Sequence, residues 1–139
     1  MSTKINVKNL SVGYQSIISN GKHAIIGDEP IPSQGTDLGF SPVELVLAGI
    51  AMCKVATIRN VARRKGWDIG EVDAQLTQDV HRQEGKSFKT SVNSQISIEG
   101  TITDEQHAYL IKKADNCYVT RLLQGEWDFQ ESDSLQLVK

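Results

Sequence analysis

The sequence contains few of the residues on which several functional classes depend. Its 139 residues include two cysteines, three histidines and three prolines, and aromatic residues make up 6% of the chain. The formal net charge is −2, which gives no electrostatic reason to expect nucleic acid or an anionic membrane as a partner. No histidine has the spacing of a zinc ligand relative to either cysteine, so we expect no metal site.

Long hydrophobic runs are also missing. The longest apolar run covers residues 45–53, about half of what a bilayer-spanning helix needs. The N-terminal residues alternate between polar and apolar, which indicates a strand and not a signal peptide. We therefore expect no membrane segment and a cytoplasmic location, where thiols stay reduced and pair only transiently. The length suits one domain, residues 1–139.

The first 40 residues are predicted to form strands followed by a loop. Residues 3–27 alternate as strands do, and Asn20-Gly21 is a strong signal for a two-residue hairpin turn. Residues 28–40 contain two prolines and two glycines, and this loop is long enough to be functional.

A long helix is predicted over residues 41–65. Ser41 and Glu44 have the spacing of a capping box, Pro42 suits the first helical position, and Gly66 ends the pattern. The first half of this helix is apolar on every side, so it should be covered on every side. Because a domain of this size rarely encloses a helix alone, we expect a partner subunit to pack over it.

The rest of the chain predicts two long strands between residues 69 and 99, with a turn at 84–86. A second capping box at residues 103–106 begins a helix that reaches about Asn116. A short helix over 117–124 and a final strand around 127–137 complete an α+β domain with antiparallel strands.

The two cysteines are the best candidates for chemistry. Cys53 ends the apolar run inside the long helix, and Cys117 lies where one helical pattern stops and the next begins. Free amides at a helix N-terminus would favour a thiolate at Cys117. Thiols can take an oxygen atom from a peroxide or pair as a disulfide. A buried cysteine is also often only a small core residue, so both readings stay open.

Three segments carry a family resemblance: residues 41–53, Gly100 with residues 103–106, and residues 114–119. Together they resemble the OsmC/Ohr family, whose members are intertwined homodimers with antiparallel sheets around a long buried central helix. The resemblance implies thiol-dependent reduction of organic hydroperoxides, with Cys53 as the peroxidatic thiol and Cys117 as the resolving thiol. It also implies an external dithiol as reductant and no cofactor.

The sequence departs from the family's peroxidases near the first cysteine. Val43 stands where those enzymes have a glutamate, and Glu44 lies about 100° further round the helix. Glu44 is therefore a candidate catalytic residue whose capping role is at least as plausible. Those enzymes also use an arginine from the N-terminal strands, and this chain has none before Arg59.

Without a cation, an apolar helix disfavours a thiolate and makes a slower nucleophile. Lys54, Arg59 and Arg121 are the candidate replacements for the arginine. A further departure is Tyr118, which follows Cys117 where proline is usual. The alternative function is therefore a redox-sensing or small-molecule-binding dimer without efficient peroxidase turnover.

Overall fold

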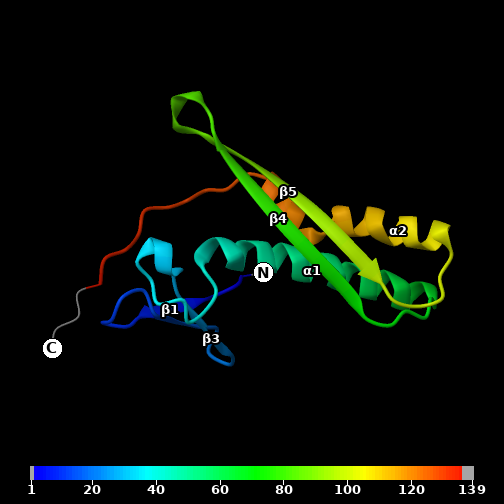
Figure 1. Ribbon diagram of the computed structural model, residues 1–139, viewed down its shortest axis with the longest axis horizontal. Coiled ribbons are helices and arrows are strands. Elements are labelled where there is room, and N and C mark those ends of the chain that lie inside the picture. Colours follow the sequence, from blue (N-terminus) through cyan, green and yellow to red (C-terminus); the bar gives the residue numbers. More distant parts are fainter. Residues whose placement is uncertain (1, 136–139) are drawn as a thin grey trace. The chain divides into compact units, whose positions relative to one another are not determined.

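The computed structural model describes residues 2–135, without the side chain of Lys86, and confirms the predicted α+β class (Figure 1). Its elements are β1 (Asn6–Asn9), β2 (Ser16–Ser19), β3 (Ala24–Gly27), the 3₁₀ helix η1 (Ile31–Ser33), α1 (Pro42–Lys65), β4 (Val72–Arg82), the 3₁₀ helix η2 (Glu84–Lys86), β5 (Phe88–Ile98), α2 (Asp104–Asp115) and α3 (Tyr118–Gln124). The described residues divide into two compact units, one of residues 2–52 and 73–97 and the other of 53–72 and 98–135. The prediction of one domain over residues 1–139 stays a prediction.

The strand expected over residues 127–137 is wrong for the part that the structure describes. Residues 126–135 have no regular secondary structure, and residues 136 and 137 lie outside the described range. Trp127 and Phe129 stack on each other instead, with ring centroids 5.7 Å apart. A strand needs a hydrogen-bonded neighbour, and neither sheet in residues 2–135 includes this segment.

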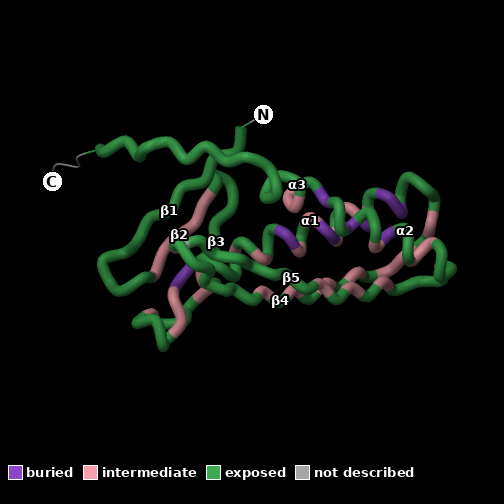
Figure 2. The backbone as a smooth tube through the Cα atoms, turned by 90° about the horizontal axis from the view of Figure 1, so that it is seen from above, coloured by how far each residue is buried: buried purple, intermediate pink, exposed green. Residues whose placement is uncertain are grey.

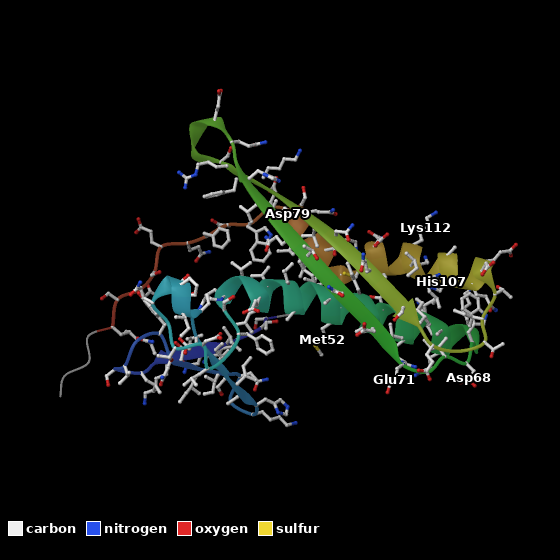
Figure 3. The ribbon with its side chains drawn as sticks, viewed as in Figure 1. Met52, Asp68, Glu71, Asp79, His107 and Lys112 are labelled. Atoms are coloured by element: carbon white, nitrogen blue, oxygen red, sulfur yellow. The ribbon has the colours of Figure 1, made fainter. Side chains whose placement is uncertain are left out.

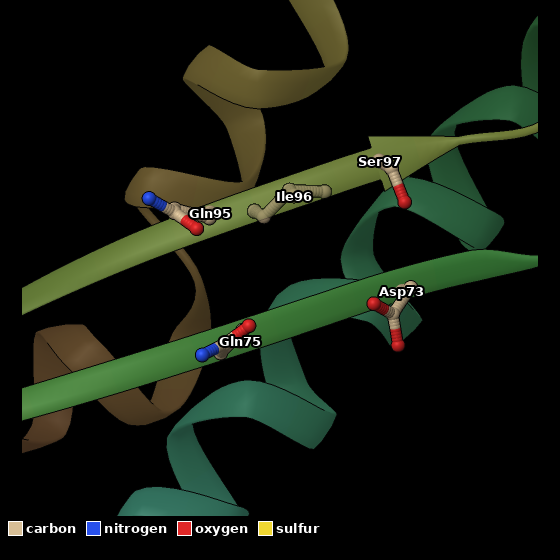
Figure 4. A pocket seen from close by; sticks show the side chains of 5 residues that line it. All are labelled: Asp73, Gln75, Gln95, Ile96 and Ser97. Atoms are coloured by element: carbon tan, nitrogen blue, oxygen red, sulfur yellow. The ribbon is translucent and has the colours of Figure 1, made fainter.

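Two antiparallel sheets belong to the first unit. One has the order β1-β2-β3, and the other pairs β4 with β5. The predicted hairpin between β2 and β3 is confirmed, but its turn is centred on Gly21 and Lys22, one residue later than predicted, because the Asn20 amide donates to the His23 carbonyl. The Asn20 side chain accepts hydrogen bonds from the amides of Lys22 and His23, and Gly21 has a φ of 91°. The polar face of the β4–β5 pair is exposed, and the residues lining its shallow depression are Asp73, Gln75, Gln95, Ile96 and Ser97 (Figure 4).

A buried carboxylate organises the loop between β3 and α1. Asp28 is 4% exposed, and its oxygens accept hydrogen bonds from the backbone amides of Glu29, Thr36 and Leu38. The Thr36 hydroxyl also donates to it, at 2.6 Å. This last bond is the main cause that lowers the pKa of Asp28, and burial opposes it. The long loop is therefore an ordered part of the fold.

The start of α1 confirms the predicted capping box. The Ser41 amide donates to the Glu44 carboxylate at 2.8 Å, and the Glu44 amide donates back to the Ser41 hydroxyl at 3.3 Å. The expected cover on every side, however, is not provided by the described part of one chain. Val43, Val46 and Met52 remain 54%, 52% and 73% exposed. Figure 3 shows Met52 projecting away from the helix. Local elements of the chain cover only part of the helix circumference.

The second unit holds the best-buried core. α2 runs alongside the second half of α1 (Figure 1), and Trp67 meets Tyr109 edge-on with centroids 5.8 Å apart. The second predicted capping box, between Thr103 and Gln106, is confirmed. The residues that are at most 3% exposed are Ile58, Val61 and Ala62 of α1, Leu110 and Ala114 of α2, and Cys117 (Figure 2). Leu110, Ala114 and Cys117, at spacings of four and three residues, therefore share the face that is turned to the core.

Candidate functional site: a thiol pair

The fold brings the two cysteines to the same end of α3. Cys53 lies on α1 and is partly exposed, whereas Cys117 directly precedes α3 and is 1% exposed. The backbone amide of Val119 lies 3.4 Å from the Cys53 sulfur and donates to it. The Cys53 thiol therefore lies at the first turn of α3, next to Cys117, although the two residues are far apart in the sequence. Both are free thiols.

The N-terminus of α3 acts on both thiols, and not only on the one that the sequence indicated. Cys117 is the N-cap residue of α3, and the Thr120 amide in the first turn favours its thiolate. The free amide of Val119 faces Cys53. Cys117 has another partner, since its sulfur lies 3.0 Å from the Thr120 hydroxyl. Thr120 is absent from the predicted site, although its position three residues after an N-cap is a recognisable signal.

The surroundings of Cys117 favour its thiolate. Burial by itself would raise the pKa of the Cys117 thiol. Hydrogen bonds to the side chain and backbone of Thr120, contact with the Cys53 thiol and the charge of Lys54 together outweigh burial, so that the pKa is lowered. The predicted direction at Cys117 is confirmed, and the predicted cause contributes to it, because the Thr120 amide lies in the first turn of α3.

Of the three candidate cations, Lys54 is the one whose charge helps to lower the pKa of Cys117. It is 6% exposed, and its Nζ lies 3.2 Å from Oδ1 of Asp115. Arg59 donates to two backbone carbonyls in the connection between α1 and β4. Arg121 lies over the Tyr118 ring, 5.7 Å from its centroid. Arg59 and Arg121 therefore serve other contacts within the described residues.

Glu44, the third predicted site residue, is placed in the first unit, nine residues before Cys53 on α1. Its carboxylate accepts a hydrogen bond from the Ser41 backbone, and this bond is the main cause that lowers the pKa of Glu44. The structure thus gives Glu44 a structural use, and a catalytic role for it stays a prediction. Within residues 2–135, no three His, Cys, Asp or Glu side chains are grouped so as to hold a metal ion.

Two neighbouring thiols beside a buried ammonium define a site for thiol and disulfide chemistry. Residues 35–132, which include both cysteines and Lys54, match the family model of OsmC-like proteins, and the chain belongs to this family. α1 is the one helix in residues 2–135 that is long and apolar enough to span a membrane, and it fits the core helix of this family's fold. A comparison with curated proteins gives no match.

Solved structures share the fold. An OsmC-like protein from Mycoplasma pneumoniae is 20% identical, with a TM-score of 0.74, over 90% of this chain and 89% of that one. An organic hydroperoxide resistance protein OsmC from Legionella pneumophila is 21% identical, with a TM-score of 0.68, over 90% of each chain. An organic hydroperoxide resistance protein from Elizabethkingia anophelis is 19% identical, with a TM-score of 0.66, over 90% of this chain and 91% of that one. At these identities the likeness establishes the fold alone.

Proposed function

We propose that this protein reduces organic hydroperoxides with Cys53 and Cys117. The observation that carries the proposal is the contact between the Cys53 sulfur and the Val119 amide at 3.4 Å, which places both thiols at one end of α3. Membership of the OsmC family supports it, as do two structural neighbours named for resistance to organic hydroperoxides.

The reaction requires only thiols, a peroxide and an external dithiol. The thiolate of one cysteine attacks the terminal peroxide oxygen, the O–O bond breaks, and the alkoxide takes a proton to leave as an alcohol. The resulting sulfenic acid condenses with the second thiol, which forms a disulfide and releases water. A dithiol of the solvent then reduces this disulfide in two exchange steps and is itself oxidised.

Exposure supports a division of roles between the thiols. Cys53 is partly exposed, whereas Cys117 is 1% exposed, so Cys53 is the thiol that a peroxide would meet first. The lowered pKa of Cys117 suits the resolving step, because a thiolate is the form that attacks the sulfenic sulfur. Cys53 is therefore assigned the attack on peroxide, and Cys117 its resolution. A reducing compartment such as the cytoplasm would keep both cysteines in the reduced thiol form that the reaction requires.

The function is tested by mixing the purified protein with cumene hydroperoxide and dithiothreitol. Many equivalents of hydroperoxide should be consumed per protein chain, with the appearance of the corresponding alcohol. Failure to consume even one equivalent would contradict the proposal.

We also propose that the working form is a homodimer. Val43, Val46 and Met52 point in different directions around the first half of α1, at 100° per residue, and each is more than half exposed. An open groove beside this half of the helix is lined mainly by apolar residues: Phe40, Glu44, Leu47, Ala48, Ala51 and Leu76. Apolar surface on several sides of one helix favours cover by a second copy.

Val46→Glu is expected to weaken this dimer at least about tenfold, because burying a carboxylate without a partner is costly. Light scattering after gel filtration measures the mass directly. The matched control is Val12→Glu, which alters another exposed valine, 63% exposed, in the loop between β1 and β2. A wild-type protein that is a monomer at micromolar concentration would contradict the homodimer.

A redox-sensing role is the second candidate, and one observation favours it. The ammonium of Lys54 is already paired with Asp115 at 3.2 Å, so only part of its charge is left for a thiolate. A sensor would form the same disulfide, but slowly. Its rate with hydroperoxide would lie near that of a free thiol, whereas an efficient peroxidase would exceed that rate by orders of magnitude.

A further inference from the structure

Lys54 is buried to an extent that its one ion pair does not explain. Lysine is almost never fully buried, because its ammonium loses hydration, yet Lys54 is 6% exposed. Its partner Asp115 has a side chain that is 64% exposed. A single contact with a solvated carboxylate stabilises little, so the ion pair alone is a weak reason to keep an ammonium in the core.

The thiol pair lies in the same region as this ammonium. The Lys54 ammonium contacts Asp115 at the end of α2, at 3.2 Å, and Asp115 lies two residues before Cys117. The hydrogen bond from Val119 holds the Cys53 sulfur at the start of α3, next to Cys117. The contact with Asp115 therefore brings the ammonium to the segment that carries Cys117.

The other two candidate cations have other partners. Arg121 of α3 lies over the Tyr118 ring, and Arg59 of α1 donates to backbone carbonyls. The charge of Lys54 is among the causes that lower the pKa of Cys117, although it is weaker than the hydrogen bonds from Thr120. Among the described residues of α1, α2 and α3, Lys54 is thus the cation whose charge acts on a thiol.

We infer that Lys54 is a positioning residue for the thiol pair: its ammonium stabilises a thiolate there, and Asp115 both holds the ammonium and reduces the charge that it offers. The inference deepens the proposed function, because the thiolate is the form that reacts with peroxide and with sulfenic acid. It concerns thiol ionisation, however, and this can be measured without any peroxide.

The inference predicts that changes at the two members of the ion pair have opposite effects. Lys54→Met removes the positive charge and should lower the thiolate population. Asp115→Asn removes the negative charge, leaves the ammonium in place and should raise the thiolate population. If the ion pair only held the fold together, both changes would disturb the thiol site in the same direction or leave it unchanged.

The test uses the full chain with one thiol left, Cys53→Ser, so that the far-ultraviolet thiolate absorbance reports Cys117 alone. The variant that also has Cys117→Ser serves as the blank. At about pH 8, Lys54→Met should lower the thiolate fraction about three- to tenfold, and Asp115→Asn should raise it about two- to threefold. Lys54→Arg, which keeps the charge, should retain the fraction within about twofold.

The matched control is Lys112→Met, which removes an exposed lysine from the last turn of α2, the turn that also carries Asp115 (Figure 3). It should leave the thiolate fraction unchanged. An unchanged fraction in Lys54→Met, or a shift of Lys54→Met and Asp115→Asn in the same direction, would overturn the inference. If Lys54→Met does not fold by circular dichroism, a thiolate fraction that fails to rise in Asp115→Asn is sufficient to overturn it.

The outcomes also separate this inference from the proposed function. Wild-type protein that consumes no hydroperoxide would overturn the function, and the thiolate fractions would still decide the role of Lys54. Conversely, if the wild-type protein consumes hydroperoxide but Lys54→Met leaves the thiolate fraction unchanged, the proposed function stands and the inference about Lys54 is overturned.

Discussion

Cys53→Ser should lower the consumption of cumene hydroperoxide, with dithiothreitol as reductant, at least about a hundredfold. A hydroxyl is a far weaker nucleophile than a thiolate at neutral pH, and the remaining thiol, Cys117, is 1% exposed. The rate is measured from the loss of hydroperoxide and the appearance of cumyl alcohol.

The matched variant is Cys117→Ser, which removes the other thiol with the same change of atoms. It should still react with one equivalent of hydroperoxide at about the wild-type rate, because Cys53 keeps its exposure and its hydrogen bond from Val119. The sulfenic acid should then accumulate and be trapped by dimedone. Two results would contradict the assignment of roles. One is undiminished consumption of hydroperoxide by Cys53→Ser, and the other is a Cys117→Ser variant that fails to react with one equivalent of hydroperoxide.

Leu110→Ala should destabilise the protein by about 2–5 kcal/mol, the usual cost of a cavity in a closely packed core. Leu110 is completely buried on α2, on the face that also carries Ala114 and Cys117. Urea unfolding followed by circular dichroism measures the change in the free energy of unfolding.

Leu135→Ala is the control for this prediction, since Leu135 is 87% exposed in the single chain and the same atoms are removed. It should change the free energy of unfolding by less than about 0.5 kcal/mol. Equal effects of the two substitutions would mean that the face of α2 that carries Leu110 is not the core of the second unit.

The parts of the fold that could be predicted are those that neighbouring residues determine. Both capping boxes place a side chain three residues from the amide it accepts from, so Ser41 with Glu44 and Thr103 with Gln106 are visible in the sequence. The hairpin turn between β2 and β3 depends in the same way on neighbouring residues, since Gly21 takes the positive φ that the turn requires. The α+β class followed from these local signals.

The site depended on contacts between remote residues, and the sequence alone predicted it less well. Lys54 was one of three candidate cations, and its burial and its effect on the pKa of Cys117 separate it from the other two. Free amides at the start of α3 were expected to favour a thiolate at Cys117 alone, but the Val119 amide donates to Cys53, which the sequence places far away. The final strand failed for a similar reason: alternation around Trp127 predicts extended chain, but not a neighbour to pair with.

The account depends most directly on a disulfide between Cys53 and Cys117 of the same chain. Reduced protein freed of dithiol is given one equivalent of cumene hydroperoxide, blocked with an alkylating agent, digested and analysed by mass spectrometry. We predict a single cross-linked peptide pair containing Cys53 and Cys117, lighter by two hydrogens than the separate peptides. Recovery of both cysteines as alkylated thiols, or of Cys53 oxidised to sulfinic acid while Cys117 remains a thiol, would contradict the account.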